Sequence, residues 1–444
     1  MTAIHELAEK ATALNREKLP EEVVHQAKRA VIDWYASLFP GLSTAPVQLL
    51  ERALVEDLDH GGARLALGRA ATARAAALIN GAAAHAAEVD DSFREAMYHP
   101  GAATIAAALA AGQTAGIDGA AFLRAVVVGY EVSTRIGVVM GRRHYKYWHS
   151  TGTVGTFGAA SAASAVHGLD SEQFAHALAT AATFAAGLQQ AFRMDSMSKP
   201  LHAGRAAEAG VLAASLARLG LTGSLDVLDG DAGLGQAMSD GPAWGGVADT
   251  LGDDFHIARL TFKNHIGCGH TFAAIDGALA LQALHGVAAK DIARVHVGTY
   301  RPALDIACHE RPATANEARF SLKYVVASAL VHGSVRMAAF EPLRLQDPLT
   351  RSLMERIEVS VDPTLDAAFP KQRAAQIGIE TTDGRSLTYL QPNRKGDPEE
   401  PLGDADLQDK FMELASPVLG DERARMLIAR LWRLETAVSL TEAN

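Results

Sequence analysis

Alanine-rich stretches fill the first 260 residues of the chain, and no other feature constrains its fold as strongly. Alanine is the best helix former because it loses no side-chain entropy when a helix forms. Glycine and proline interrupt these stretches at helix-length intervals, for instance at Gly168, Pro200 and Gly220. We therefore predict a compact bundle of closely packed helices, which span 20–39, 72–87, 104–115, 119–137, 155–167, 171–190 and 203–219.

The pattern changes near residue 290, where apolar and polar residues alternate as they do along β-strands. The alternation covers 292–300 and 356–362, and the stretch 376–390 contains the dipeptide Asp383-Gly384, which is typical of a hairpin turn. Between these strands, 316–333 has a helical pattern. This part of the chain therefore predicts a smaller region of mixed α and β structure.

A second helical stretch, at 404–436, follows a polar loop rich in proline and glycine. We expect this tail to return to the helical region, which makes that domain discontinuous. The predicted fold class is mainly α with an α+β second domain. Residues 1–264 and 402–444 are expected to form the large all-helical domain, and 265–401 the smaller α+β domain.

Charge and cysteine usage argue against several classes of protein. The 444 residues carry a formal net charge of −10, whereas proteins that grip nucleic acid are more often basic. The two cysteines, Cys268 and Cys308, exclude a disulfide scaffold. The N-terminal residues lack a signal-peptide pattern and no stretch is apolar enough to cross a bilayer. We expect a cytoplasmic protein without nucleic-acid or membrane partners.

Standard cofactor motifs are missing from the sequence. It contains no GxGxxG, no Walker A loop, no HExxH and no GxSxG. There are 17 histidines, but few lie at ligand spacing, and Cys268-Gly-His270 has no companion pair of ligands nearby. We therefore expect neither a cofactor nor a metal, and chemistry that is carried out by side chains alone.

Two segments of the helical region are unusual because polar and charged residues gather in them. The segment 88–101 contains Asp90, Asp91 and His99, and its His-Pro-Gly ending indicates a helix stop. The segment 142–153 holds three cations, three aromatic residues and two histidines just before an expected helix start, where an anion is favoured. Both segments also fit plain surface loops, with helix-capping carboxylates or a basic face.

Two further segments combine charged residues with backbone-bending ones. In 189–205, Lys199 directly precedes a proline, which favours an extended or turned backbone that can aim the ammonium into a cleft. The segment 263–271 lies at the expected domain junction, a favoured place for pockets. The plain alternatives are a surface lysine and a glycine-rich linker.

Together these segments resemble the MmgE/PrpD family, and the resemblance runs along nearly the whole chain. It implies a large helical domain completed by the C-terminal tail, a smaller α+β domain, cofactor independence and a homodimer. The motifs that carry it are Asp90-Asp91, His99-Pro100-Gly101, Gly129-Tyr130-Glu131, Trp148-His149, Ser198-Lys199-Pro200, Cys268-Gly269-His270, Glu317 to Tyr324 and Asp409-Lys410-Phe411.

The resemblance also implies which residues form the active site. The family usually has a histidine at the position of Phe272, and His270 is the candidate substitute in this sequence. The active-site positions of the family match Asp90, His99, His149, Lys199 and Tyr324.

Known members of the family act next to carboxylates of small polycarboxylic acids, which implies removal of a proton from the carbon alpha to a carboxylate. We predict His149 as the base and Lys199 as the second choice, with Tyr145 or Tyr324 as the proton donor. Cations offset the charge that builds on the substrate. The expected substrate-binding residues are Asp91, Arg142, Lys146, Arg193 and His270, with Arg143 adding to the positive field.

The carboxylates Asp90 and Asp91 are expected to orient His99 or Lys199. The pair Tyr145-Lys146 beside His149 favours a substrate that has many carboxylates and expels no water. The predicted reaction is therefore the epimerisation of iminodisuccinate, an isomerase reaction by acid–base catalysis. A 2-methylcitrate-type dehydratase and a non-catalytic polycarboxylate-binding protein on the same fold are the alternatives.

Overall fold

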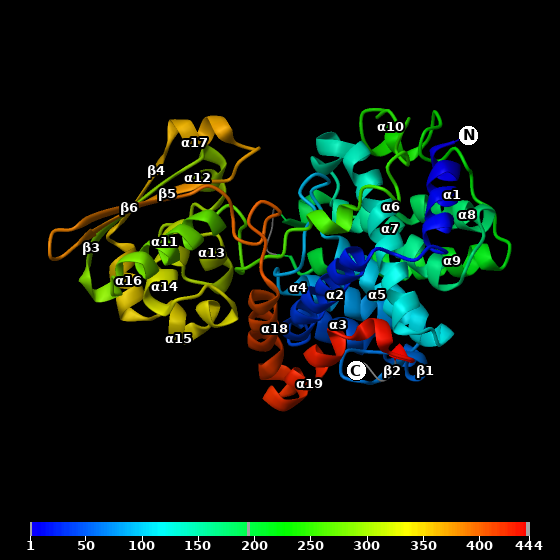
Figure 1. Cartoon of the computed structure of the whole chain (residues 1–444), viewed down its shortest axis with the longest axis horizontal. Coiled ribbons are helices and arrows are strands. Elements are labelled where there is room, and N and C mark those ends of the chain that lie inside the picture. Colours follow the sequence, from blue (N-terminus) through cyan, green and yellow to red (C-terminus); the bar gives the residue numbers. More distant parts are fainter. Residues whose placement is uncertain (1, 193–195, 441–444) are drawn as a thin grey trace. The chain divides into compact units, whose positions relative to one another are not determined.

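The computed structural model describes residues 2–192 and 196–440 of the chain. The chain divides into two compact units, which are Met1–Thr261 with Gly403–Asn444, and Phe262–Leu402. Apart from a short ribbon of β1 (Leu58–Arg64) and β2 (Ala70–Ala71), the regular structure of the first unit is helical, whereas the second unit combines helices with a sheet (Figure 1). The predicted fold class, mainly α with an α+β part, is confirmed.

Five alanine-rich helices form the centre of the first unit, and α7 contacts α5, α6 and α9, while α4 contacts α5 and α9. Every residue of α7 from Ser150 to Ala165 is buried, which small side chains allow. At Gly204 on α9, an added Cβ would lie 2.2 Å from the carbonyl oxygen of Leu78, so only glycine permits this approach. The five helices are α4 (Ala73–Ala86), α5 (Pro100–Ala115), α6 (Gly119–Tyr145), α7 (Ser150–Val166) and α9 (Lys199–Arg218).

The C-terminal segment contributes α18 to the first unit, and α18 packs against α2 (Figure 1). The other helices of this unit are α1 (Ala3–Leu14), α2 (Glu21–Gly41), α3 (Ala45–Ala53), α8 (Ser171–Phe184), α10 (Leu234–Met238), α18 (Asp404–Leu419) and α19 (Asp421–Leu431).

A four-stranded sheet organises the second unit, with the strand order β4-β3-β5-β6. The strand β3 runs parallel to β4 and antiparallel to β5, and β5 and β6 form the predicted hairpin. Gly384 has a φ of +89° in its turn, which glycine adopts without strain. The strands are β3 (Ile292–Thr299), β4 (Ile357–Val361), β5 (Ala375–Thr381) and β6 (Ser386–Gln391).

Helices cover this sheet, since α11 contacts β5 and β6 and α14 contacts β4. Ile377 and Ile379 alternate with more exposed residues along β5 and are fully buried, as a sheet covered in this way requires. The helices of this unit are α11 (Phe272–His285), α12 (Arg301–Ile306), α13 (Ala315–Arg319), α14 (Leu322–His332), α15 (Pro342–Leu345), α16 (Pro348–Met354) and α17 (Pro363–Ala368).

None of the helices that the structure describes combines the length and the apolar character needed to traverse a lipid bilayer.

Candidate active site

Three long helices of the first unit begin at residues that the sequence marked as candidates. His99 is the N-cap of α5, His149 is the N-cap of α7, and Lys199 is the first residue of α9. The predicted stop at His-Pro-Gly is wrong: Pro100 takes the first position of α5, where the missing N–H costs nothing. Each helix start presents the positive end of the helix dipole, which favours an anion.

The starts of α5 and α7 are joined directly. The backbone N–H of His99 donates to Oγ1 of Thr151, at a distance of 3.2 Å. The histidines of this region also lie against one another: the ring centroid of His85 lies 4.9 Å from that of His99 and 5.4 Å from that of His149. The candidates from α5 and α7 are therefore brought together around His85, at the end of α4.

Asp90 is the carboxylate at the centre of this histidine cluster. Its Oδ2 lies 2.8 Å from Nδ1 of His85 and 3.4 Å from Nδ1 of His99. Asp90 is 1% exposed and His85 0%. An ionised carboxylate only accepts hydrogen bonds, so both imidazoles must carry a proton on Nδ1. The burial of this charge-assisted pair strengthens it and fixes the orientation of both rings.

The tautomer of His99 is determined by a second contact. Its Nδ1 lies 2.6 Å from the backbone carbonyl oxygen of Asp91, which also can only accept a hydrogen bond. The side chain of His99 is 19% exposed, more than that of Asp90. His99 therefore keeps Nε2 as the ring nitrogen that can exchange a proton with a bound molecule.

His149 is held in its neutral form. Burial lowers its pKa well below the usual range, and the nearby His85, Lys199, His202 and His99 lower it further. Its Nδ1 lies 3.0 Å from Nδ1 of His202, whose pKa is also lowered, mainly by burial. One of these two nitrogens must donate and the other accept, so the tautomer of His202 decides whether Nε2 of His149 is a base or a donor.

Lys199 lies at the more exposed side of the cluster. Its Nζ pairs with the carboxylate of Glu88, and their side chains are 24% and 30% exposed. Glu88 has a φ of +62°, a left-handed conformation that residues other than glycine rarely adopt. Such conformations persist where the surrounding structure over-determines them, and they concentrate at functional sites.

Asp91 faces away from the imidazoles, toward the start of α5. Its carboxylate accepts hydrogen bonds from the Gly101 N–H at 3.0 Å and the Tyr130 hydroxyl at 2.7 Å. Burial raises the pKa of Asp91 to about 8, and the negative charge of Asp33 raises it further, whereas the hydrogen bond from Tyr130 lowers it. The expected substrate-binding side chain is thus engaged inside the protein.

The cationic segment before His149 lies outside the histidine cluster. Tyr145, at the end of α6, is 38% exposed, and Arg142 and Lys146 are exposed as well. Nζ of Lys146 lies 5.2 Å from the centre of the Tyr147 ring, to which it is attracted. The structure therefore does not bring Tyr145 or Lys146 into contact with His149, although they are close in sequence.

Three further residues were predicted to belong to the site. Arg193 falls outside the described residues. Tyr324 belongs to the second unit, where its buried hydroxyl donates to the carbonyl of Ala339. His270 belongs to the same unit, and its Nδ1 lies 3.0 Å from the Tyr300 hydroxyl. Burial lowers the pKa of His270 to about 4, with help from two neighbouring arginines.

Phe272, which stands where the family usually has a histidine, is 2% exposed and begins α11. Its ring meets that of His265 edge to face, with the centroids 5.5 Å apart. Phe272 thus acts as a core residue of the second unit, and His265 binds Asp276 at 2.7 Å.

Sequence reasoning missed three members of the cluster, His85, Glu88 and His202. His85 is a single histidine in a run of alanines, five residues before Asp90. Its place there was the one sequence feature that could have marked it as a site residue. His202 follows Lys199 by three residues on one helix, which places both side chains on the same face.

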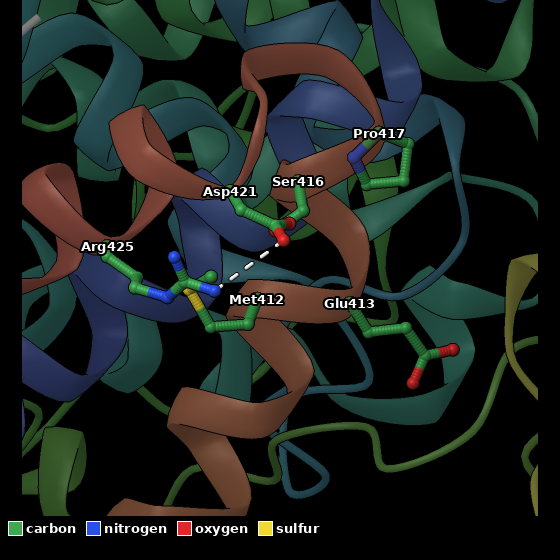
Figure 2. A pocket seen from close by; sticks show the side chains of 6 residues that line it. All are labelled: Met412, Glu413, Ser416, Pro417, Asp421 and Arg425. Atoms are coloured by element: carbon green, nitrogen blue, oxygen red, sulfur yellow. Dashed lines mark ion pairs between the residues drawn. The ribbon is translucent and has the colours of Figure 1, made fainter.

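Within the part of the chain that the structure describes, His85, Asp90 and His99 bring ligand atoms within 4.8 Å of one another, a spacing that could hold a metal ion. These atoms already serve as donors and acceptors of one hydrogen-bonded network. The hollow shown in Figure 2 lies apart from this cluster, on α18 and α19, and contains none of the predicted site residues. There Arg425 pairs with Asp421 at 3.5 Å, and both side chains are 68% exposed.

Comparisons with known proteins match two consecutive parts of the chain to two domain models of one family. The MmgE/PrpD N-terminal domain model matches residues 5–246, and the MmgE/PrpD C-terminal domain model matches residues 265–435. A cis-aconitate decarboxylase-like protein of Aspergillus oryzae is 28% identical over 471 residues, which cover 98% of this chain and 95% of that protein.

Two mammalian relatives are similar at the same level. The cis-aconitate decarboxylase of Homo sapiens is 28% identical over 449 residues, covering 96% of this chain and 91% of the human protein. That of Mus musculus is 30% identical over 398 residues, covering 81% of this chain and 75% of the mouse protein. The chain belongs to the MmgE/PrpD family.

Proposed function

We propose that this protein is a cofactor-independent enzyme that acts on a small polycarboxylic acid, with decarboxylation of cis-aconitate as the best-supported reaction. The observation that carries the proposal is the cluster at the starts of α5, α7 and α9. There His99 pairs with Asp90, His149 stacks on His85, and Lys199 pairs with Glu88. Positive helix ends and an ammonium suit a substrate with several carboxylates. The names of the relatives support decarboxylation over epimerisation.

The chemistry requires a carbanion that is stabilised by a neighbouring carboxylate. In cis-aconitate the bond between carbon and one carboxylate breaks, CO₂ leaves, and the electron pair spreads through the double bond toward a second carboxylate. One proton then adds to carbon. Lys199 and the three helix ends are placed to offset the charge that builds on the remaining carboxylates.

The environments of the two flanking imidazoles suggest their roles. The carboxylate of Asp90 stabilises positive charge on His99, which suits the proton donor that decarboxylation needs, whereas His149 is held neutral, which suits the base that epimerisation needs in addition. Environments that separate two titratable groups in this way are typical of an acid–base pair.

Epimerisation of iminodisuccinate is the second candidate. Two imidazoles flank His85, and epimerisation needs two acid–base groups acting on one carbon. The support that Tyr145 and Lys146 lent to this reaction in the sequence is weaker in the structure, because both side chains are exposed. A homodimer and a cytoplasmic location stay predictions.

The test uses the full-length protein, treated with a chelator and incubated in D₂O with cis-aconitate, iminodisuccinate and 2-methylcitrate in turn. Products are identified by NMR and mass spectrometry. We expect loss of CO₂ from cis-aconitate and a single deuterium on a product carbon. Deuterium gain without any change of composition would instead establish an epimerase, and loss of water a dehydratase. Binding without turnover or exchange would overturn the proposal that the protein is an enzyme.

A further inference from the structure

Lys410 lies on α18, in the Asp409-Lys410-Phe411 motif, and contributes a buried charge close to the histidine cluster. Its side chain is 0% exposed, as is that of Asp33 on α2. Nζ of Lys410 lies 2.6 Å from Oδ1 of Asp33 and 2.8 Å from the backbone carbonyl oxygen of Val89. A residue near the end of the chain therefore binds the backbone of the loop that follows α4.

The hydrogen bond from Lys410 to the Val89 carbonyl acts next to two carboxylates of the cluster. Val89 stands between Glu88, which pairs with Lys199, and Asp90, which binds His85. The backbone of Glu88 is left-handed, with a φ of +62°, so other groups must hold it in place. A fully buried, charge-assisted hydrogen bond to the next carbonyl is a restraint of this kind.

We propose that Lys410 is a positioning residue of the active site. Its ammonium holds the Val89 carbonyl and so fixes the directions in which the Glu88 and Asp90 carboxylates point. Its role in catalysis rests on the proposed function, whereas its role in the geometry does not. The pair with Asp33 supplies the negative charge that allows this ammonium to be buried.

A single substitution of Lys410 would not separate positioning from folding, because it would leave Asp33 buried without its counter-charge. The informative variant is the double substitution Asp33→Leu with Lys410→Met. Apolar side chains fill the same space, and such replacements of buried ion pairs are often neutral or stabilising. No donor then remains at position 410 for the Val89 carbonyl, while the packing of α18 on α2 is retained.

We expect this double variant to lose about 10- to 100-fold in kcat through misplacement of the carboxylates. Its Tm should stay within about 4 °C of the wild type. The matched control is Arg29→Met, which removes another cation that links α2 to α18, through its ion pair with Asp404. Its kcat should stay within about threefold of wild type. A double variant with wild-type kcat, or an equal loss in Arg29→Met, would overturn the proposal.

A readout without substrate separates this inference from the proposed function. In the ¹⁵N-histidine-labelled full-length protein, the imidazole N–H protons that Asp90 binds are identified by their change of chemical shift in Asp90→Asn. We expect these signals to shift or vanish in the double variant and to persist in Arg29→Met. Unchanged signals would overturn the inference even if no substrate is found. If the double variant does not fold, Asp33→Asn with Lys410→Met removes both buried charges with a smaller change of shape at position 33. It should shift the same signals, and unchanged signals would again contradict the inference.

Discussion

Replacing Asp90 with asparagine removes the negative charge that two imidazoles share while keeping the shape of the side chain. Oδ2 of Asp90 accepts a hydrogen bond from His85 at 2.8 Å and lies 3.4 Å from Nδ1 of His99, within ion-pair distance. A hydrogen bond to a charged group contributes about 1.5–3 kcal/mol, and one between neutral groups about 0.5–1.5 kcal/mol. The charge therefore accounts for about 1–1.5 kcal/mol in each bond, or about 2–3 kcal/mol in both.

If this stabilisation acts on the imidazolium in the transition state, the loss corresponds to about 30- to 160-fold in kcat at 1.36 kcal/mol per tenfold. The longer contact to His99 places the expected value toward the lower end. The assay compares kcat and KM of Asp90→Asn and wild type on the active substrate, with circular dichroism to verify folding. A kcat within about threefold of wild type would refute the reasoning, because it would show that the charge is not used.

The neighbouring residue supplies the control. Asp91→Asn changes the carboxyl group that binds Tyr130 and Gly101, not the imidazoles, so we expect kcat to fall far less than in Asp90→Asn. The wild-type carboxyl, with its pKa raised to about 8, binds a proton more tightly than in the unfolded chain. Its contribution to stability is full below the usual pKa and is lost as pH rises from there to about 8. Denaturant unfolding should therefore show a smaller loss of stability in Asp91→Asn between about pH 4 and about pH 8, and an unchanged pH dependence would contradict this.

Three further outcomes follow from the structure. Because burial lowers the pKa of His149, its neutral form persists below pH 6.5, so the acid limb of kcat/KM should lie below that pH. A limb at or above pH 6.5 would argue against the neutral imidazole of His149 as the essential form. Gly101→Ala places a Cβ 2.6 Å from the Tyr130 oxygen. The free energy of unfolding, measured with urea, should fall by about 1–3 kcal/mol. An unchanged urea midpoint would contradict this packing. Tyr145→Phe, at an exposed position, should leave kcat within about threefold, and a larger loss in steady-state assays would return Tyr145 to the site.

The helical architecture could be predicted because alanine-rich patterns repeat over whole helices. The starts of α5, α7 and α9 were placed four or five residues too late, at 104, 155 and 203 instead of 100, 150 and 199. The caps and first turns of these helices hold His99, His149 and Lys199, which interrupt the alanine and apolar periodicity that predicts a helix. The strand β1 was missed because Leu58–Arg64 contains charged residues and two glycines rather than an alternation.

The site could be predicted only in part, for a physical reason. Asp90, His99, His149 and Lys199 were found through the family resemblance, and the first three lie within one network. Closeness to His149 in sequence did not predict membership of the site. The chain turns between α6 and α7, so Tyr145 is exposed while His149 is buried. His202 was missed because a single histidine inside a helix gives no signal until the packing of α7 on α9 brings it to His149.

The most direct test of the account is the kcat of His149→Ala on the substrate that the wild type turns over, in a variant shown to be folded and to bind that substrate. The proposed mechanism requires the neutral imidazole of His149 to exchange a proton with the substrate, and general acid–base groups contribute about 10²- to 10⁴-fold. It therefore predicts a loss of that size in kcat with little change in the melting temperature. A folded variant with near wild-type kcat would contradict it and would move the chemistry away from this cluster.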